Sequence, residues 1–353
     1  MDPDAIDGVG RATHGGTAHE ELLDFSANTN PEFPAGTRSA FEAAFDDSRR
    51  YPDDDYAEFR RAAAGFLDRF HDADCDPSNV IVSPGGLAAI RLVVAVTVGR
   101  GDTALVPAPS FAEYAREVRL QGGNPVFRPQ EELLEADPTG HALAIVCTPN
   151  NPTGKLASQD RLRAFADRCR RAETTLLVDE AFLGFVDVPS IAGTDGVVVV
   201  RSLTKLFGLP GIRVGYAVAS GDVRDRLRTA RRPWNLSTPA ARVGTHCLNA
   251  DRRGSTFVAD TRKQVERERE RLRKRIVEAR QYEFESPAPP TPAGPFLLLR
   301  VANDRSVEDI ISTTRDRGVA VRDARSFRGL DAHVRVAVKD PESNDRMLNA
   351  LHG

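Results

Sequence analysis

A run of four valines, Val197–Val200, is the feature that most constrains what this chain can fold into. A continuous run of β-branched residues predicts a strand that is buried on both faces, as in a parallel sheet. The run is followed by Ser202 and Lys205, and then by Pro210-Gly211, which prevents a helix from continuing. In open α/β sheets, ligands bind outside the carboxyl ends of the strands. The sequence therefore places polar and charged side chains where a ligand site is expected.

Apolar runs that end in polar residues recur before the valine run, and helical patterns separate them. Repeated alternation of this kind predicts an α/β fold with a mostly parallel sheet that is wrapped by helices. Strands are predicted at 80–82, 103–106, 143–147, 175–178 and 197–200. Helices are predicted at 37–46, 56–70, 87–98 and 158–172, with one more that ends near 121.

The ends of the chain have a different character. Residues 1–35 contain the turn signals Gly15-Gly16 and Asn30-Pro31, so an extended arm is expected there. After residue 235 the patterns predict helices at 252–282 and 307–317, and strands at 296–301, 319–322 and 333–338. For 353 residues we expect an arm at 1–35 that joins the small domain, a large domain at 36–240 and a smaller α+β domain at 241–353.

The composition excludes several classes of protein. The net charge is −3 and the charges are well mixed, so neither nucleic acid nor a membrane surface is an expected partner. No apolar signal segment is seen, and the longest apolar stretch, 87–98, is too short to span a bilayer. We therefore expect a cytoplasmic protein. No metal is predicted, because no zinc or redox spacing relates the four cysteines, Cys75, Cys147, Cys169 and Cys247.

Polar residues at the predicted strand ends fit the binding of pyridoxal phosphate. A lysine amine can form a Schiff base with an aldehyde, and Lys205 is one of only five lysines, against 43 arginines. Ser202 and Arg213 can hold a phosphate beside it. Asp179 directly follows an apolar strand, and an anion there would keep the pyridine nitrogen protonated. Asn151 could donate to the ring hydroxyl.

Two further features belong to the same expected site. Gly85-Gly86-Leu87 opens a predicted helix, whose free N–H groups and dipole favour an anion such as the cofactor phosphate. Phe111 follows another strand end and could stack on the cofactor ring. Each residue also has an ordinary interpretation: Asp179 as a helix cap, Asn151 as a turn residue, Phe111 as core and the lysine as a solvated side chain. The combination predicts the site.

The motifs resemble those of the fold type I pyridoxal phosphate aminotransferases over nearly the whole chain. The fold implied is a large domain with a mostly parallel seven-stranded sheet wrapped by helices, plus a smaller α+β domain. The resemblance also implies a homodimer with a shared active site, in which Tyr51 reaches the neighbour's cofactor phosphate. Arg335 is implied to bind a substrate carboxylate or phosphate. The motifs are Asn151-Pro152-Thr153-Gly154, Asp179-Glu180-Ala181-Phe182 and Ser202-Leu203-Thr204-Lys205 with Arg213.

Within this superfamily the chain is most similar to the branch of histidinol-phosphate aminotransferase and L-threonine-O-3-phosphate decarboxylase. Two features favour the decarboxylase. One is the motif His14-Gly15-Gly16, and the other is Phe182, because the aminotransferases usually have a tyrosine at the position of Phe182. Leu87-Ala88 and Pro295 depart from the usual pattern without removing a catalytic group.

The resemblance implies a phosphorylated amino substrate, held by Arg322 and Arg335 together with His14 and Asn28 from the arm. If the arginines hold the α-carboxylate perpendicular to the cofactor ring, carbon dioxide leaves; if the Cα hydrogen lies there, transamination follows. The leading expectation is decarboxylation of L-threonine O-3-phosphate to aminopropanol phosphate, for cobalamin biosynthesis. The alternative is a histidinol-phosphate or related aminotransferase that uses 2-oxoglutarate. His14 could equally be a solvated loop residue.

Two other classes of protein fit the sequence less well. A non-catalytic relative that keeps the fold as a regulator is disfavoured, because Lys205 is present and no DNA-binding segment is visible. A Rossmann dehydrogenase is disfavoured because no Gly-x-Gly-x-x-Gly opens a helix after the first strand.

Overall fold

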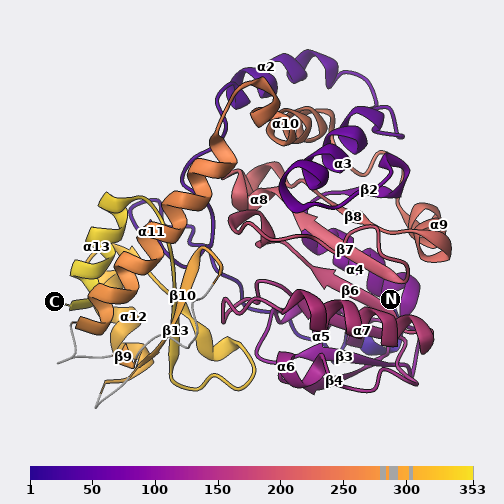
Figure 1. Ribbon diagram of the computed structural model, residues 1–353. Coiled ribbons are helices and arrows are strands. Elements are labelled where there is room, and N and C mark those ends of the chain that lie inside the picture. The colour runs from indigo at the N-terminus through magenta and orange to yellow at the C-terminus, as the bar shows by residue number, and fades with distance from the viewer. Residues whose placement is uncertain (279–283, 286–292, 302–304, 353) are drawn as a thin grey trace.

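The computed structural model describes residues 1–278, 284–285, 293–301 and 305–352. Its centre is a seven-stranded sheet in which only β8 runs against the other strands, so the prediction of a mostly parallel sheet is confirmed (Figure 1). In spatial order the strands are β2 (Val80–Ser83), β8 (Gly215–Val218), β7 (Val197–Ser202), β6 (Thr175–Asp179), β5 (Leu143–Cys147), β3 (Thr103–Pro107) and β4 (Asn124–Arg128).

The valine strand β7 is buried on both faces, as its composition predicted. Because side chains alternate along a strand, Val198 and Val200 pack in one core layer, and Val197 and Val199 pack in the opposite one. The first layer lies under α4 (Gly86–Thr97), α5 (Glu113–Leu120) and α9 (Gly221–Ala230). The second includes α3 (Ala57–His71), α7 (Gln159–Arg171) and α10 (Thr238–Leu248).

A second region packs beside the large sheet, with the long helix α11 (Phe257–Glu278) running along it (Figure 1). Its antiparallel sheet has the order β12 (Arg322–Asp323), β13 (His333–Ala337), β10 (Phe296–Val301) and β9 (Phe284–Glu285). Strand β1 (Leu23–Asp24) pairs with β11 (Val319–Ala320), which ties residues near the N-terminus to this region. The remaining helices are α1 (Pro3–Ile6), α2 (Thr37–Asp47), α6 (Gln130–Leu133), α8 (Leu203–Leu206), α12 (Val307–Asp316) and α13 (Pro341–His352).

Some expectations from the sequence were wrong in detail. The strand expected at 319–322 is divided after Ala320, because β11 pairs with β1 whereas β12 pairs with β13. The charged helix expected from residue 252 begins at Phe257, after Gly254 takes a left-handed conformation with φ 81°. Its expected end, 279–282, lies outside the described residues. Strands β4 and β8 and helices α9 and α10 were not predicted. The division into three parts stays a prediction.

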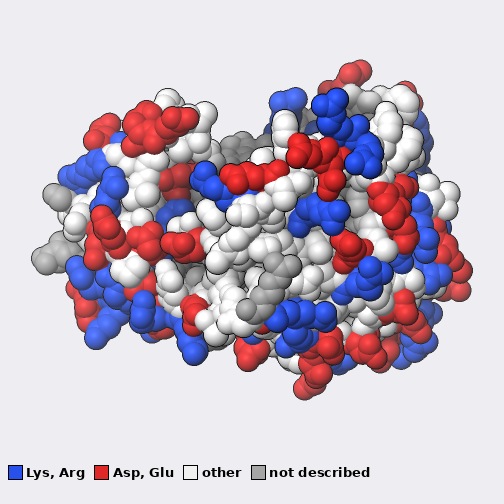
Figure 2. Space-filling view, turned by 90° about the horizontal axis from the view of Figure 1, so that it is seen from above, with Lys and Arg blue, Asp and Glu red and all other residues white. Residues whose placement is uncertain are grey.

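The surface, the helices and the cysteines give three further observations. Acidic and basic side chains are interspersed over the described part of the face drawn in Figure 2. No helix among the described residues is long and apolar enough to cross a membrane. The cysteines Cys75, Cys147, Cys169 and Cys247 are all buried and free of disulfides.

Candidate active site

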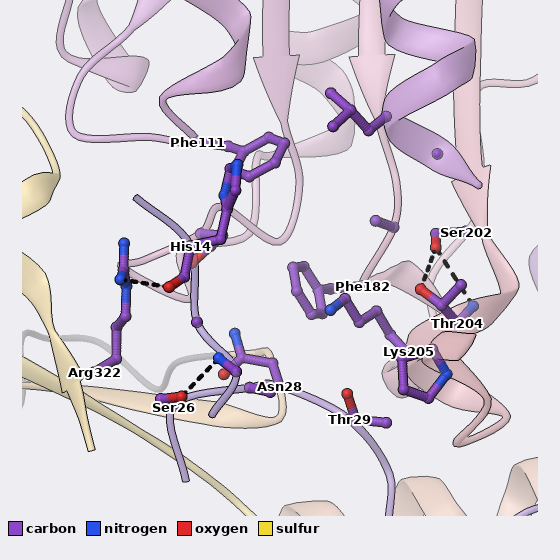
Figure 3. A pocket seen from close by; sticks show the side chains of 18 of the residues that line it. His14, Ser26, Asn28, Thr29, Phe111, Phe182, Ser202, Thr204, Lys205 and Arg322 are labelled. Atoms are coloured by element: carbon purple, nitrogen blue, oxygen red, sulfur yellow. Dashed lines mark hydrogen bonds between the residues drawn. The ribbon is translucent and has the colours of Figure 1, made fainter. Parts of the chain in front are cut away.

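A cavity of about 560 Å³ lies at the carboxyl ends of the central strands, between the two regions of the fold. Figure 3 shows His14 beside Phe111 on one side of it and Lys205 with Ser202 and Thr204 on the other. The structure thus brings together residues that are up to 322 positions apart in the chain, from Thr13 to Arg335. Among the predicted site residues, those that line the cavity are His14, Asn28, Gly86, Leu87, Phe111, Asn151, Asp179, Ser202, Lys205, Arg213, Arg322 and Arg335.

Lys205 lies in the short helix α8, directly after β7, and Ser202 caps that helix. Burial, assisted by the positive charges of Arg335 and Arg213, lowers the pKa of Lys205 to about 8, while Asp24 opposes the shift. No carboxylate in the described part of the chain forms an ion pair with its Nζ. A buried amine with a lowered pKa is a better nucleophile near neutral pH than a solvated lysine.

The residues predicted to bind the cofactor phosphate lie together at the N-terminus of α4. Gly85 has φ 92°, and a Cβ at this position would lie 2.7 Å from Arg213 Nη2. A Cβ at Gly86 would lie 3.2 Å from Ser202 Cβ. Because both residues lack a side chain, Arg213 and Ser202 can lie against the start of α4, where the first N–H groups have no partner within the helix. The phosphate of the predicted cofactor therefore fits a site formed by Gly85, Gly86, Leu87, Ser202 and Arg213.

Asp179 ends β6 and is almost fully buried at the bottom of the cavity. Its Oδ1 accepts from the Ala181 N–H at 2.9 Å, and its Oδ2 accepts from the Tyr114 hydroxyl at 2.6 Å. Burial raises the pKa of Asp179, and these two hydrogen bonds and the charge of Arg201 oppose that effect. Sequence reasoning missed Tyr114; its three-residue spacing from Phe111 was the available signal, since it places both rings on one side of the chain.

Two arginines of the smaller region, Arg322 and Arg335, point into the cavity and are 6% and 4% exposed. Neither is paired with a carboxylate among the described residues; they donate to backbone carbonyls and to the side chains of Asn151 and Ser326. Arg335 Nη1 donates to Asn151 Oδ1 at 2.6 Å, and burial lowers the pKa of Arg335 to about 9. Burying an uncompensated cation is costly, so this arrangement favours an anionic ligand.

Among the residues that line the cavity, two buried polar atoms lack a hydrogen-bond partner, namely Arg335 Nε and Asn28 Oδ1. Buried polar groups are nearly always satisfied in folded proteins. Both residues line the cavity, so a polar ligand could complete their hydrogen bonding.

His14, Phe111 and Tyr51 were also expected at the site, and the structure places the first two, but not Tyr51, in the cavity lining. His14 Nε2 lies 2.9 Å from Glu113 Oε1, and its ring is 5.6 Å from that of Phe111. The His14 backbone carbonyl accepts from Arg322 at 2.9 Å, so the arm crosses between the two regions. Tyr51 does not line the cavity: it is 78% exposed and stacks on Trp234 at 4.5 Å. Its predicted contact with a neighbouring subunit stays a prediction.

A second buried cluster, which was not predicted, contains Glu180, the residue that follows Asp179 in the chain. Arg201 Nη1 donates to Glu180 Oε2 at 2.9 Å, and its Nη2 donates to His71 Nε2 at 3.1 Å. His71 Nδ1 in turn donates to the Val188 carbonyl at 2.9 Å, and burial lowers the pKa of this imidazole to about 2. Ser190 Oγ completes the cluster by donating to Glu180 at 2.7 Å.

Comparison with known proteins assigns the class. The aminotransferase class I and II family model matches residues 20–351, and the chain belongs to this family of pyridoxal phosphate-dependent enzymes. The chain is therefore an enzyme, of aminotransferase or carboxy-lyase type. The family resemblance expected from the sequence is confirmed, as is the fold class.

Individual relatives carry both of the expected activities. Histidinol-phosphate aminotransferase 2 of Archaeoglobus fulgidus is 30% identical over 342 residues, covering 94% of this chain and 93% of that protein. Threonine-phosphate decarboxylase of Salmonella typhimurium is 31% identical over 362 residues, covering 96% and 93%. The two identities are nearly equal, so overall similarity does not distinguish the reactions.

Solved structures agree on the fold. The histidinol-phosphate aminotransferase of Clostridium acetobutylicum has a TM-score of 0.80 at 24% identity, with 94% of this chain and 98% of that chain covered. The L-threonine-O-3-phosphate decarboxylase of Porphyromonas gingivalis has a TM-score of 0.78 at 24% identity, with 93% and 100% covered.

Proposed function

We propose that this enzyme binds pyridoxal phosphate on Lys205 and decarboxylates L-threonine O-3-phosphate to aminopropanol phosphate, a step of cobalamin biosynthesis. The observation that carries the proposal is the pair of buried arginines, Arg322 and Arg335, which face the same cavity as Lys205 without a carboxylate partner among the described residues. A substrate with a carboxylate and a phosphate would supply the missing negative charge.

The cofactor would be held by residues at the carboxyl ends of five strands, β2, β3, β5, β6 and β7, and by Arg213 just before β8. Ser202, Arg213 and the N-terminus of α4 at Gly85-Gly86-Leu87 would bind its phosphate, and Phe111 would stack on its ring. Asp179 would accept a hydrogen bond from the ring nitrogen, and Asn151 would donate to the ring oxygen. When bound, this cofactor supplies an electron sink for a bond that breaks at the substrate Cα.

The side chains around the substrate would decide which bond breaks. Arg335 and Arg322 are rigidly held by their hydrogen bonds to Ser26, Asn151, Thr13 and His14, so they can fix the direction of a carboxylate. A carboxylate held perpendicular to the cofactor ring is the group that leaves. Asn28 and His14 would contact the phosphate, Asn28 through its amide NH2 group, because the unpaired Asn28 Oδ1 is an acceptor and would need a donor instead.

Phe182 supports decarboxylation over transamination. It lines the cavity and lies against Phe296, with 5.1 Å between ring centroids. Aminotransferases of the branch usually place a tyrosine at this position, whose hydroxyl would donate to the ring oxygen. Here Asn151 would be the donor.

Transamination of histidinol phosphate with 2-oxoglutarate is the second candidate. The supporting observation is the 30% identity, over 94% of this chain, to histidinol-phosphate aminotransferase 2 of Archaeoglobus fulgidus. In that reaction a neutral Lys205 amine would take a proton from Cα. In either reaction the proposed enzyme is a cytoplasmic homodimer whose Tyr51 completes the active site of a second copy.

The two reactions are separated by their products. The purified protein, loaded with pyridoxal phosphate, is incubated with L-threonine O-3-phosphate alone, and separately with histidinol phosphate and 2-oxoglutarate. Release of carbon dioxide without any keto acid is the expected result. Glutamate formation in the second incubation, without carbon dioxide in the first, would contradict the proposal in favour of the aminotransferase.

A further inference from the structure

Tyr114 is buried beneath the proposed cofactor site, in contact with Asp179. It projects from α5, is 0% exposed, and its hydroxyl donates to Asp179 Oδ2 at 2.6 Å. This distance is typical of a hydroxyl that donates to an ionised carboxylate. The other oxygen of Asp179 accepts from the Ala181 N–H at 2.9 Å. Because each carboxylate oxygen can accept two hydrogen bonds, Asp179 retains capacity for a donor on the cavity side at either oxygen.

The ring of Tyr114 supports a second residue of the site. It meets the ring of Phe111 edge to face, with 5.6 Å between the centroids. Tyr114 thus contacts both the residue proposed to stack on the cofactor ring and the residue proposed to face its nitrogen. A phenylalanine at this position would keep the ring packing and remove only the hydroxyl.

Several groups around Asp179 act on its proton affinity. Burial raises the pKa of Asp179, and the hydrogen bond from Tyr114 is the main effect that opposes it. The backbone N–H of Ala181 and the charge of Arg201 on β7 act in the same direction as Tyr114. Cys147, which faces the pair from β5, has a raised pKa because it is buried, so it stays neutral and adds no charge. Without the phenol, the carboxylate would have to remain ionised with one strong donor fewer.

We propose that Tyr114 is a positioning residue that orients the Asp179 carboxylate and keeps it ionised, so that the ring nitrogen of bound pyridoxal phosphate retains its proton. This inference rests on the cofactor named under the proposed function. A hydrogen bond to the ionised form of an acid lowers its proton affinity. Removing the hydroxyl would make the carboxylate more basic, and the shared proton would move from the ring nitrogen toward Asp179. The cofactor would then withdraw electrons less strongly.

The test uses the full chain loaded with pyridoxal phosphate that carries ¹⁵N in the ring. The ¹⁵N chemical shift distinguishes a protonated from a neutral pyridine nitrogen, so it reports the proton directly and independently of turnover. Tyr114→Phe is compared with the wild-type protein and with Tyr56→Phe. Tyr56 is a matched control, because it is also buried and its hydroxyl donates at 2.8 Å to the Leu236 carbonyl, away from the cavity.

The expected result is a protonated nitrogen in the wild-type protein and in Tyr56→Phe, and a signal displaced toward neutral pyridine in Tyr114→Phe. The substrate turnover number should fall at least about tenfold in Tyr114→Phe, with a smaller change in KM. Thermal unfolding of each apoprotein checks that the variants are folded. An unchanged ¹⁵N shift in folded Tyr114→Phe would overturn the role of Tyr114 alone. A wild-type protein that binds no cofactor would overturn both this inference and the proposed function.

Discussion

Asp179 and Glu180 are neighbours in the chain, but they take part in two buried clusters with opposite properties. In the closed cluster, Glu180 is paired with Arg201, and His71 and Ser190 complete their hydrogen bonds. In the open cluster, which lines the cavity, the cations of Lys205, Arg322 and Arg335 have no carboxylate partner among the described residues. The charges of the closed cluster neutralise each other. The cations of the open cluster would be neutralised by an anionic ligand.

Both clusters are buried, and the difference in how their charges are paired explains why substitutions should have different consequences in each. A buried ion pair is weak evidence for net stability, but the loss of one partner leaves an uncompensated charge, which is costly. A buried cation without a partner is already costly, and a bound anion removes that cost. We therefore expect substitutions in the closed cluster to affect stability, and substitutions in the open cluster to affect binding.

The largest expected effect on stability is in the closed cluster. Glu180→Gln removes the partner of Arg201, and the free energy of unfolding should fall by about 3–5 kcal/mol. Urea unfolding of the apoprotein measures this change. Glu135→Gln is the control, because the Arg161–Glu135 pair is exposed and should contribute less than about 1 kcal/mol. Equal losses in the two variants would remove the distinction between the clusters.

A smaller energy, about 1.5–3 kcal/mol, is expected for the substrate contact of Arg335. Arg335→Met should raise KM for the phosphorylated substrate by roughly 10- to 100-fold, because a charged hydrogen bond to the substrate is lost. Steady-state kinetics measures this, with Arg161→Met on the exposed surface as the control. The free energy of unfolding should change less than in Glu180→Gln. An unaltered KM would show that Arg335 serves the fold only.

The smallest predicted change is in the pH midpoint at which Lys205, in the open cluster, binds the cofactor. Burial disfavours the charged form of Lys205, so its amine should become neutral, and able to capture the cofactor, as the pH rises through about 8. The rate of pyridoxal phosphate binding to the apoprotein, measured against pH, gives this midpoint. Arg335→Met should move it upward, since the variant removes a like charge that lowers the pKa. A midpoint near 10.5, the ordinary value for lysine, would contradict the burial argument.

The sequence predicted the parallel core well, because buried strands are continuous apolar runs. Val197–Val200 is the clearest example, and the polar residues that follow such runs are the ones that line the cavity. Strand β4 was missed because it lies at the edge of the sheet, is partly exposed and contains Pro125, which weakens its strand pattern. Strand β8 was missed because Gly215–Val218 follows the loop around Arg213 and is only four residues long.

The contacts between distant residues could not be predicted in the same way. Tyr114 and Asp179 are separated by 65 positions, and His71 and Arg201 by 130, so no local pattern joins them. Glu180 follows the same strand as Asp179, but only the tertiary structure shows that its carboxylate is used by Arg201. The sequence indicated which residues could do the chemistry, and the fold shows which charges are neutralised.

The most direct test of the account locates the cofactor on the chain. The protein is incubated with pyridoxal phosphate, reduced with borohydride so that the carbon–nitrogen bond becomes permanent, digested and analysed by mass spectrometry. The added mass is expected on Lys205 and should be absent from Lys205→Ala. A label on another of the five lysines in the chain, or no label at all, would contradict the assignment of this cavity as the active site.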